Sequence, residues 1–277
     1  MLEKETNHYG GAGMTIAEAF IKTATNGHRA LIPYFTAGYP SEEEFIDIVS
    51  MCLQDGADIV EIGIPFSDPV ADGPTIQYAS QQALISGITT ARTLELLHRL
   101  DNPLGKPLVI MSYLNPVLQY GLKTFISDAH DAGVRGLIIP DLICDEAREI
   151  EKLSDCGGID LIHLLAPTST ADRQEMILNR SRGFVYLVSV AGVTGARRDL
   201  PDDLNEWVTS VRDKSPIPVA VGFGISGPEQ ARRVSQVADG VIVGSAIINI
   251  LKNGTSSRVR VRKAHQFVKQ LKKAIAR

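Results

Sequence analysis

One carboxylate in this chain lies inside a stretch that is otherwise apolar. Glu61 interrupts residues 59–64, whose β-branched side chains are typical of a strand buried on both faces, where a charge is costly. A second acid, Asp72, follows in a loop broken by prolines and glycine, which can fold back over the end of that strand. The pattern predicts that the two carboxyl groups lie together at the mouth of one pocket, at the end of that strand. The pKa of Glu61 should be raised by burial, and Asp72 should be ionised on a polar loop. The alternative is structural, with Glu61 paired to a buried base and Asp72 only capping a helix.

Two glycine-rich segments suit the binding of an anion. Residues 222–227 match the G-x-G-x-x-G pattern, but Asp239, the acid that a dinucleotide site would need, lies at the start of the next strand and therefore at the opposite edge of the sheet. Gly244 and Ser245 end another strand and begin a helix, whose free N–H groups and positive dipole end favour an anion. Together the segments predict a phosphate cradle. The alternative is that their glycines only permit tight turns.

A third segment, residues 189–200, consists largely of small residues and predicts a mobile lid that closes on a bound substrate. Within it, Gly195 can bring a backbone N–H group close to a phosphate, and Thr194 is expected to help hold the lid shut. Just before it, Tyr186 lies inside a strand, where its ring can line a pocket while the hydroxyl reaches polar groups at the mouth. Taken alone, this tyrosine would indicate core packing.

These residues belong to a repeated unit of strand, loop and helix. Each predicted strand is short and apolar, and a helical pattern of about 10 to 15 residues follows it. Such units predict a closed (β/α)8 TIM barrel in one domain, with its functional groups on the loops that follow the strands, and an open doubly wound sheet is the alternative. The strands are expected in residues 30–35, 59–64, 108–113, 136–139, 161–165, 184–188, 219–222 and 240–243.

The two ends of the chain differ from this repeat. Residues 1–13 are polar and contain glycine, so they predict a flexible N-terminal extension before a catalytic domain of residues 14–277. An extra helix is expected at 15–25, ahead of the first strand. A further helix ending near Gln54 has Ser41 as its cap, with Glu44 completing a capping box. The basic segment 258–277 is interpreted as the solvated face of a closing amphipathic helix.

Composition excludes several classes of function. The 277 residues are 44% hydrophobic and 22% charged, which suffices for a large core. A net charge of -4 gives no electrostatic footprint for nucleic acid. Three cysteines without paired Cys-x-x-Cys spacing and six histidines without a recognisable metal set predict thiols in a reducing compartment and no metal, with His163 a satisfied core or rim histidine. Without an apolar run of about 18 residues or a signal peptide, a cytoplasmic location and no membrane contact are expected.

Four segments, 33–40, 60–77, 192–196 and 222–226, together resemble the tryptophan synthase α-subunit family. The resemblance implies a lyase that splits indole-3-glycerol phosphate into indole and glyceraldehyde 3-phosphate by a retro-aldol cleavage, without a cofactor of its own. It implies that Glu61 is the general acid/base and that Asp72 meets the indole N–H. The residues that it places around the substrate are Phe35, Tyr113, Tyr186, Thr194, Gly195, Phe223, Gly224, Gly244 and Ser245.

The same resemblance implies a protein partner. A pyridoxal-phosphate β subunit would dock on the substrate side in an α2β2 heterotetramer, with Asp68, Pro69 and Asn115 at or near the contact. Two alternatives stay open at this point. In the first, the chain is a free-standing indole-3-glycerol phosphate lyase. In the second, it is chiefly a non-catalytic activator of the β subunit.

Overall fold

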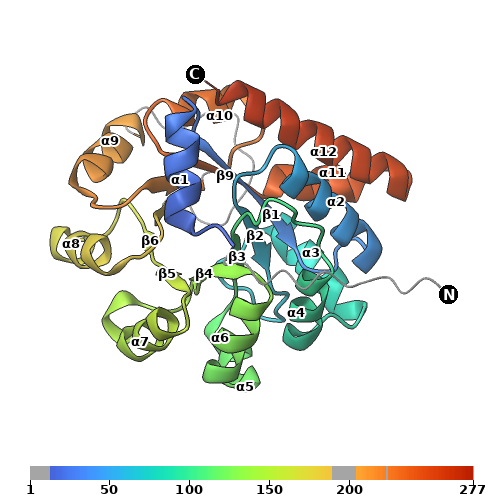
Figure 1. Ribbon diagram of the computed structural model, residues 1–277, viewed down its shortest axis with the longest axis horizontal. Helices are drawn as coiled ribbons and strands as arrows, with labels where there is room; N and C mark the ends of the chain where they lie inside the picture. The colour runs from blue at the N-terminus through green and yellow to red at the C-terminus, as the bar shows by residue number, and fades with distance from the viewer. Residues whose placement is uncertain (1–12, 189–203, 223, 277) are drawn as a thin grey trace.

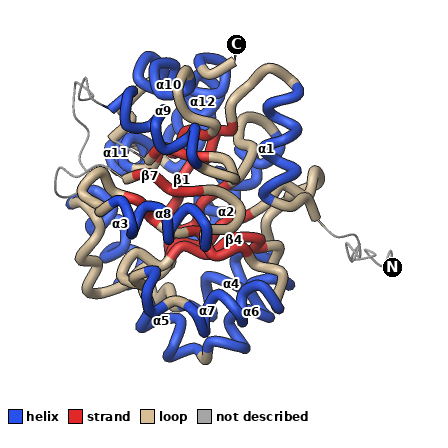
Figure 2. The backbone as a smooth tube through the Cα atoms, turned by 90° about the vertical axis from the view of Figure 1, so that its left-hand side faces the viewer, coloured by secondary structure: helices blue, strands red, loops and turns tan. Residues whose placement is uncertain are grey.

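A ring of parallel strands surrounded by helices makes up the molecule (Figure 1). The structure, a computed structural model, describes residues 13–188, 204–222 and 224–276. Figure 2 shows the strands at the centre, with helices on both sides. The strands are β1 (Ala30–Thr36), β2 (Val60–Gly63), β3 (Leu108–Met111), β4 (Val134–Ile138), β5 (Asp160–Ile162), β6 (Leu164–Leu165), β7 (Val185–Leu187), β8 (Val219–Val221) and β9 (Gly240–Val243).

The ring closes through a single segment of the chain. The strand order is β5-β4-β3-β2-β1-β9-β8-β7-β6, and only His163 separates the two outermost strands, β5 and β6. On one side Asp160 is paired with Gly136, and on the other Leu164 is paired with Tyr186. The predicted fifth strand is therefore one barrel strand interrupted at His163. The prediction of a closed (β/α)8 barrel is confirmed, and the open sheet is wrong.

Helices follow the strands and cover the outside of the barrel, and a short 3-10 turn, η1 (Cys144–Glu146), precedes one of them. None of the helices that the structure describes combines the length and the apolar character needed to cross a lipid bilayer. The described helices are α1 (Ile16–Thr25), α2 (Glu42–Gln54), α3 (Pro74–Ile85), α4 (Thr90–His98), α5 (Leu114–Tyr120), α6 (Leu122–Asp131), α7 (Arg148–Cys156), α8 (Ala171–Arg180), α9 (Leu204–Lys214), α10 (Pro228–Ser235), α11 (Ser245–Asn253) and α12 (Ser257–Ala274).

Helix α1 is the extra N-terminal helix, and it packs into the barrel interior. A capping box between Thr15 and Glu18 fixes its start. Ile16 and Phe20 belong to the same buried cluster as the inward-facing side chains of the strands. A Cβ atom at Gly240, the first residue of β9, would lie 3.1 Å from the Phe20 ring, so the strand leaves room for the helix. Because α1 packs where strands begin, the site must be sought at their carboxyl ends.

The described chain is packed from its first residues. The Met14 N–H group donates to the Gly105 carbonyl at 2.8 Å. Residues 1–12 of the predicted extension lie outside the described part of the chain.

The capping box predicted for α2 is only half formed. Ser41 accepts a hydrogen bond from the Glu44 N–H group at 3.3 Å, as expected. The Glu44 carboxylate, however, accepts from the Arg260 guanidinium of α12, with Nε at 2.7 Å. An ion pair between distant segments thus replaces the local return bond.

The basic C-terminal segment forms α12, the last helix of the fold, and it is amphipathic as predicted. Ala264, Val268 and Leu271 are buried against the core. Lys272 is not merely solvated, because its Nζ atom lies 2.6 Å from Asp58 and forms an ion pair with it. The tail is therefore an integral helix of the fold.

Candidate active site

A cavity opens at the carboxyl ends of the strands and brings together residues that are far apart in the sequence. It includes both predicted acids and part of the predicted phosphate cradle. Its walls come from the ends of β1, β2, β3, β7, β8 and β9 and from the loops after them, which is where a barrel of this kind carries its active site. The lining residues are Tyr34, Glu61, Asp72, Ile76, Met111, Tyr186, Gly222, Gly224, Ile225, Ile242, Gly244, Ser245 and Ala246.

Glu61 lies in β2, in register with Tyr34 of β1 and Val109 of β3. Its side chain is fully buried, and neither carboxyl oxygen has a hydrogen-bond partner among the described residues. Burial, and to a lesser degree the charge of Asp72, raises the pKa of Glu61 to about 8. Glu61 is therefore mainly protonated at pH 7. The alternative that it is paired to a buried base is wrong for the part of the chain that the structure describes.

Asp72 is partly buried at the mouth of the same cavity. Burial raises the pKa of Asp72 to about 6, while hydrogen bonding to the Tyr113 hydroxyl acts in the opposite direction. The carboxyl group is thus mainly ionised at pH 7, although its surroundings are less polar than the sequence suggested. Asp72 does not cap α3, because the N-cap residue of that helix is Gly73.

Tyr113 supports the loop that carries Asp72 and does not line the cavity. Its hydroxyl accepts a hydrogen bond from the Ala71 N–H group at 2.9 Å. Its ring packs against Phe66, with 5.2 Å between the ring centroids. The prediction that Tyr113 binds substrate directly is therefore corrected: the structure places it behind the loop, where it orients Asp72.

Tyr34, and not Phe35, faces the cavity. Successive side chains of a strand point to opposite faces, and in β1 the inward position falls on Tyr34, whereas Phe35 is buried in the layer between strands and helices. A Cβ atom at Gly63 would lie only 2.0 Å from the Tyr34 hydroxyl, so glycine at that position makes room for this ring. The assignment of Phe35 to the substrate pocket is wrong by one residue.

Tyr186 lines the cavity, as predicted. A Cβ atom at Gly222 would lie 2.4 Å from its ring, so the first glycine of the G-x-G-x-x-G segment accommodates a tyrosine side chain. Burial raises the pKa of both Tyr186 and Tyr34 well above the ordinary value. Both hydroxyls therefore remain neutral hydrogen-bond donors.

Gly224, Gly244 and Ser245 meet at one side of the cavity. Helix α11 begins at Ser245 with Gly244 as its N-cap residue, so the free N–H groups of its first turn and its positive dipole end lie at this side. This arrangement suits a phosphate group. Thr194, Gly195, Phe223 and the whole predicted lid, 189–200, lie outside the described residues.

The sequence reasoning missed the apolar walls of the cavity. Ile76, Met111, Ile225 and Ile242 lie beside the two acids and can contact a flat aromatic group. Aliphatic residues occur throughout the core, and nothing in their local sequence distinguishes these four. Tyr34 also gave no local signal, because every residue of β1 is buried and the sequence does not show which side of the strand faces the cavity.

The residues predicted to contact a partner lie on the surface. Asp68 and Asn115 are exposed, and Pro69 is partly exposed between Asp68 and Val70, whose side chain is 79% exposed. The loop and α3 form a shallow hollow. It is lined by Phe66, Ser67, Asp68, Pro69, Val70, Gln77, Gln81 and Leu84.

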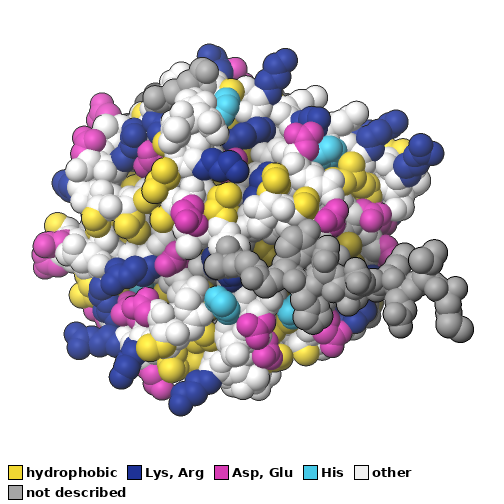
Figure 3. Space-filling model, in the orientation of Figure 1, with side chains coloured by type: hydrophobic (Ala, Val, Ile, Leu, Met, Phe, Trp, Pro, Cys, Tyr) yellow, Lys and Arg dark blue, Asp and Glu magenta, His cyan; other side chains and the backbone are white. Residues whose placement is uncertain are grey.

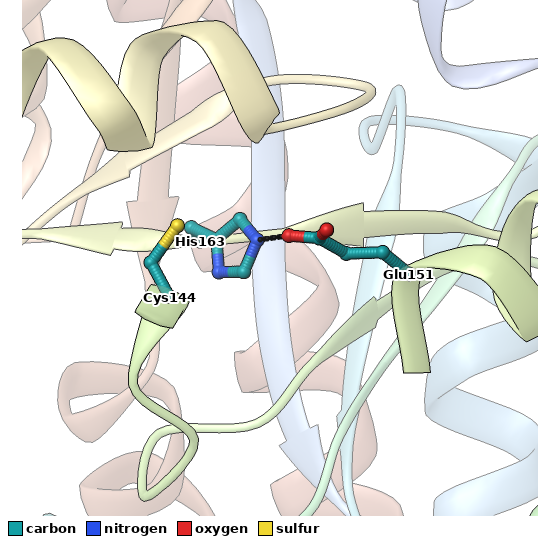
Figure 4. Close-up of side chains that lie close together, drawn as sticks. All are labelled: Cys144, Glu151 and His163. Carbon is teal, nitrogen blue, oxygen red and sulfur yellow. Dashed lines mark hydrogen bonds and ion pairs between the residues drawn. The ribbon is translucent and has the colours of Figure 1, made fainter. Parts of the chain in front are cut away.

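His163 lies outside this site and is buried, in a cluster with the buried Cys144 and the partly buried Glu151 (Figure 4). Its Nε2 atom lies 3.0 Å from Glu151, which also pairs with Arg180 at 2.8 Å. Figure 4 shows Cys144 on the opposite side of the imidazole from Glu151, and one potential ligand atom of each of the three residues lies within 4.8 Å of the others. Burial lowers the pKa of His163 and keeps the ring neutral. The prediction of a satisfied core histidine is confirmed.

The described surface carries both signs of charge. Figure 3 shows lysine and arginine side chains interspersed with aspartate and glutamate over this face. Ion pairs among the described residues include Arg173 with Asp145 at 2.9 Å and Arg92 with Glu95 at 2.6 Å. This face therefore lacks the continuous positive patch that binding of nucleic acid requires.

Comparison with known proteins agrees with this geometry. A family model described as the tryptophan synthase alpha chain matches residues 20–276. The tryptophan synthase alpha chain of Dehalococcoides mccartyi is 45% identical over 260 residues, covering 94% of this chain and 98% of that protein. The protein of the same name from Methanosarcina barkeri is 46% identical over 263 residues, covering 95% and 97%.

Solved structures with the same fold bear the same name. Mycobacterium tuberculosis tryptophan synthase superimposes with a TM-score of 0.87 at 38% identity, covering 96% of this chain and 99% of that one. The tryptophan synthase subunit alpha of Legionella pneumophila gives a TM-score of 0.87 at 34% identity, covering 95% and 98%.

Proposed function

This chain belongs to the tryptophan synthase alpha chain family, and we infer from that membership that it is a carbon–carbon lyase of tryptophan biosynthesis. As an α subunit it cleaves indole-3-glycerol phosphate into indole and glyceraldehyde 3-phosphate. One observation supports Glu61 as the residue that carries the proton chemistry: it is a fully buried carboxyl group without a hydrogen-bond partner among the described residues, and it lines the cavity together with Asp72.

The cleavage requires two proton movements and leaves the proton count unchanged. A proton must be added at indole C3, and one must be removed from the glycerol hydroxyl as the carbon–carbon bond breaks. Glu61, protonated at neutral pH because its pKa is about 8, donates the first proton. Its carboxylate then accepts the second, which restores the acid. One residue with a raised pKa can thus serve both steps.

Asp72 stabilises the positive charge that develops on the indole ring between the two proton transfers. Protonation at C3 makes the indole ring cationic and strengthens the acidity of its N–H group. With a pKa of about 6, Asp72 presents a carboxylate to that N–H group at neutral pH. Because the cavity is partly closed to water, this interaction is stronger than it would be in bulk solvent. We therefore assign transition-state stabilisation to Asp72.

The remaining cavity residues bind the two ends of the substrate. Tyr34 and Tyr186, together with the aliphatic walls, border the indole ring. Gly224, Gly244 and Ser245 hold the phosphate at the start of α11. By their place in the sequence we assign Phe223 to the indole side, Gly195 to the phosphate side and Thr194 to lid closure.

An α subunit of tryptophan synthase works with a β subunit. We propose that the β subunit receives the indole. We propose that the two form an α2β2 complex in the cytoplasm, with the pyridoxal phosphate held by the β subunit. The docking face includes Asp68, Pro69 and Asn115, which are exposed or partly exposed beside the cavity. Retention of both acids argues against a purely non-catalytic role.

Indole release from the purified chain tests the catalytic assignment. Glu61→Gln keeps the shape of the side chain but cannot transfer a proton, so its kcat should fall by about 10²–10⁴. Glu43→Gln, an exposed change on α2, is the matched control and should keep the wild-type rate. If the Glu61→Gln variant retains more than about a tenth of the wild-type kcat, Glu61 is not the general acid/base.

A further inference from the structure

The loop from Phe66 to Gly73 connects the proposed docking face with the catalytic carboxylate. Asp68 and Pro69 lie on its exposed part, and Asp72 stands at the cavity three residues after Pro69. A tight turn joins the two ends, because the Asp72 N–H group donates to the Pro69 carbonyl at 3.0 Å. A displacement of Pro69 would therefore also move the main chain of Asp72.

Gln77 holds both ends of this turn. Its Nε2 atom donates to the Asp72 carbonyl at 2.9 Å and to the Pro69 carbonyl at 3.4 Å. Its own N–H group donates to the Gly73 carbonyl at 2.9 Å, the first bond of α3. One side-chain amide on a helix thus links a residue of the docking face to the catalytic residue.

Gln77 has a fixed backbone and an exposed side chain. Helix α3 is anchored by the buried side chains of Ile76, Ala79 and Ala83, so the backbone of Gln77 is well fixed. The Gln77 side chain itself is exposed and lines the same surface hollow as Asp68 and Pro69. A protein bound in that hollow would change the surroundings of this amide without entering the cavity.

We infer that Gln77 is a positioning residue through which docking at Asp68 and Pro69 sets the orientation of the Asp72 carboxylate. This inference rests on the proposed function. When the partner fixes Pro69, the shared amide also fixes the Asp72 peptide, and the carboxylate is held where the indole N–H group will be. Docking can shift this equilibrium only by the difference in the partner's affinity for the two arrangements.

Two variants of Gln77 test the inference. Gln77→Met keeps the length of the side chain and removes both donated hydrogen bonds. In the isolated chain it should lower kcat about two- to tenfold, the range expected for loss of the shorter bond to the Asp72 carbonyl, with KM little changed. At saturating β subunit, the ratio of rates with and without the partner should fall relative to wild type, while the affinity for the partner is retained. Gln77→Glu adds a negative charge near Asp72 and should move the acid limb of the pH profile of kcat/KM to higher pH.

The matched control is Gln82→Met on the same helix, since the side chain of Gln82 makes no hydrogen bond among the described residues. If Gln77→Met and Gln82→Met give the same activation ratio and the same kcat, the inference is overturned. Amide exchange of the peptide covering 66–73 provides a readout without turnover. Faster exchange in Gln77→Met than in Gln82→Met supports the positioning role, and equal exchange overturns it. Absence of cleavage by wild type contradicts the proposed function instead.

Discussion

Glu61 combines two properties that are rarely found together in a side chain. It is fully buried in a strand, and no described residue forms a hydrogen bond with its carboxyl oxygens. A carboxylate in such a position is destabilised, which is why the pKa of Glu61 rises to about 8. The same destabilisation makes the group useful as an acid at neutral pH, because it keeps its proton until a substrate accepts it.

Glu61 should make stability depend on pH. The folded state holds this proton up to about pH 8, whereas the unfolded chain loses it near the ordinary value of 4.5, so the free energy of unfolding should decrease as pH rises between these values. By linkage, burial of the Glu61 carboxyl group lowers the free energy of unfolding by about 3 kcal/mol at pH 7, compared with a carboxyl group whose pKa is the same in both states. Glu61→Gln removes it, so the stability gained over wild type should grow from pH 5 to pH 8. Urea unfolding at each pH measures this, and a pH-independent difference would contradict the assigned pKa.

Asp72 and Glu61 should together give a bell-shaped pH profile. Activity requires Asp72 ionised and Glu61 protonated, so kcat/KM should rise through about pH 6 and decline through about pH 8. Asp72→Asn removes the charge that stabilises the cationic ring, and its kcat should fall by about 10²–10⁴ with the acid limb abolished. Steady-state kinetics from pH 5 to pH 9 provide the test. A defect confined to KM would argue against the role assigned to Asp72.

At the scale of elements, the loop after β2 is held from two directions. Tyr113, after β3, accepts a hydrogen bond from the Ala71 N–H group and packs on Phe66. Ser80 of α3 accepts from the Phe66 N–H group at 2.9 Å and donates to the Phe66 carbonyl at 3.2 Å. These contacts give a glycine- and proline-containing loop the fixed shape that a catalytic carboxylate needs.

Tyr113→Phe tests the support from β3. The variant keeps the ring against Phe66 but leaves the Ala71 N–H group without this acceptor and removes the hydroxyl that lowers the pKa of Asp72. The pKa of Asp72 should therefore rise above about 6, and the acid limb of kcat/KM should move to higher pH, with kcat at pH 7 reduced about two- to tenfold. Tyr120→Phe, whose hydroxyl bonds Asp128 on α6 at 2.7 Å, is the control. An unchanged acid limb in Tyr113→Phe would show that its hydroxyl does not act on Asp72.

At the scale of the whole molecule, the barrel separates stability from function. Its α1 end is filled by apolar side chains, while the other end carries the cavity and, beside it, the exposed loop of the docking face. Docking of a partner at this face can alter the site without disturbing the core. Allosteric couplings of this kind amount to ~1–3 kcal/mol, or roughly 5- to 150-fold.

The β subunit should therefore raise indole release by about one to two decades. Asp68→Ala should lose much of this activation, because it removes an exposed charge of the docking face, while the rate of the isolated chain changes little. Asp213→Ala on α9, on the other side of the barrel in Figure 1, should be activated like wild type. Rates with increasing β subunit, together with sedimentation of the mixture, provide the measurement. Without activation or a complex, the free-standing lyase becomes the better description.

The amino-acid sequence by itself determined the repeat and the main acids. Short β-branched runs alternating with helical patterns are local signals, and they place the barrel strands to within about two residues at each end. Glu61 was identifiable because a charged residue stands out in an apolar run. Asp72 was identifiable because the prolines and the glycine around it mark a loop directly after that strand, which is also a local signal. The helical character of the basic tail followed from its periodicity in the same way.

Only the tertiary structure decided which side chains face the cavity and what they touch. In β1 every residue is buried, so no alternation of polar and apolar residues reveals that Tyr34 points inward and Phe35 outward. The Glu44 carboxylate does not complete its capping box, because it accepts a hydrogen bond from Arg260, a partner 216 residues away in the chain. Tyr113 supports Asp72 through contacts across two loops. Each outcome depends on groups that are distant in the chain and close in space, and local sequence carries no record of that proximity.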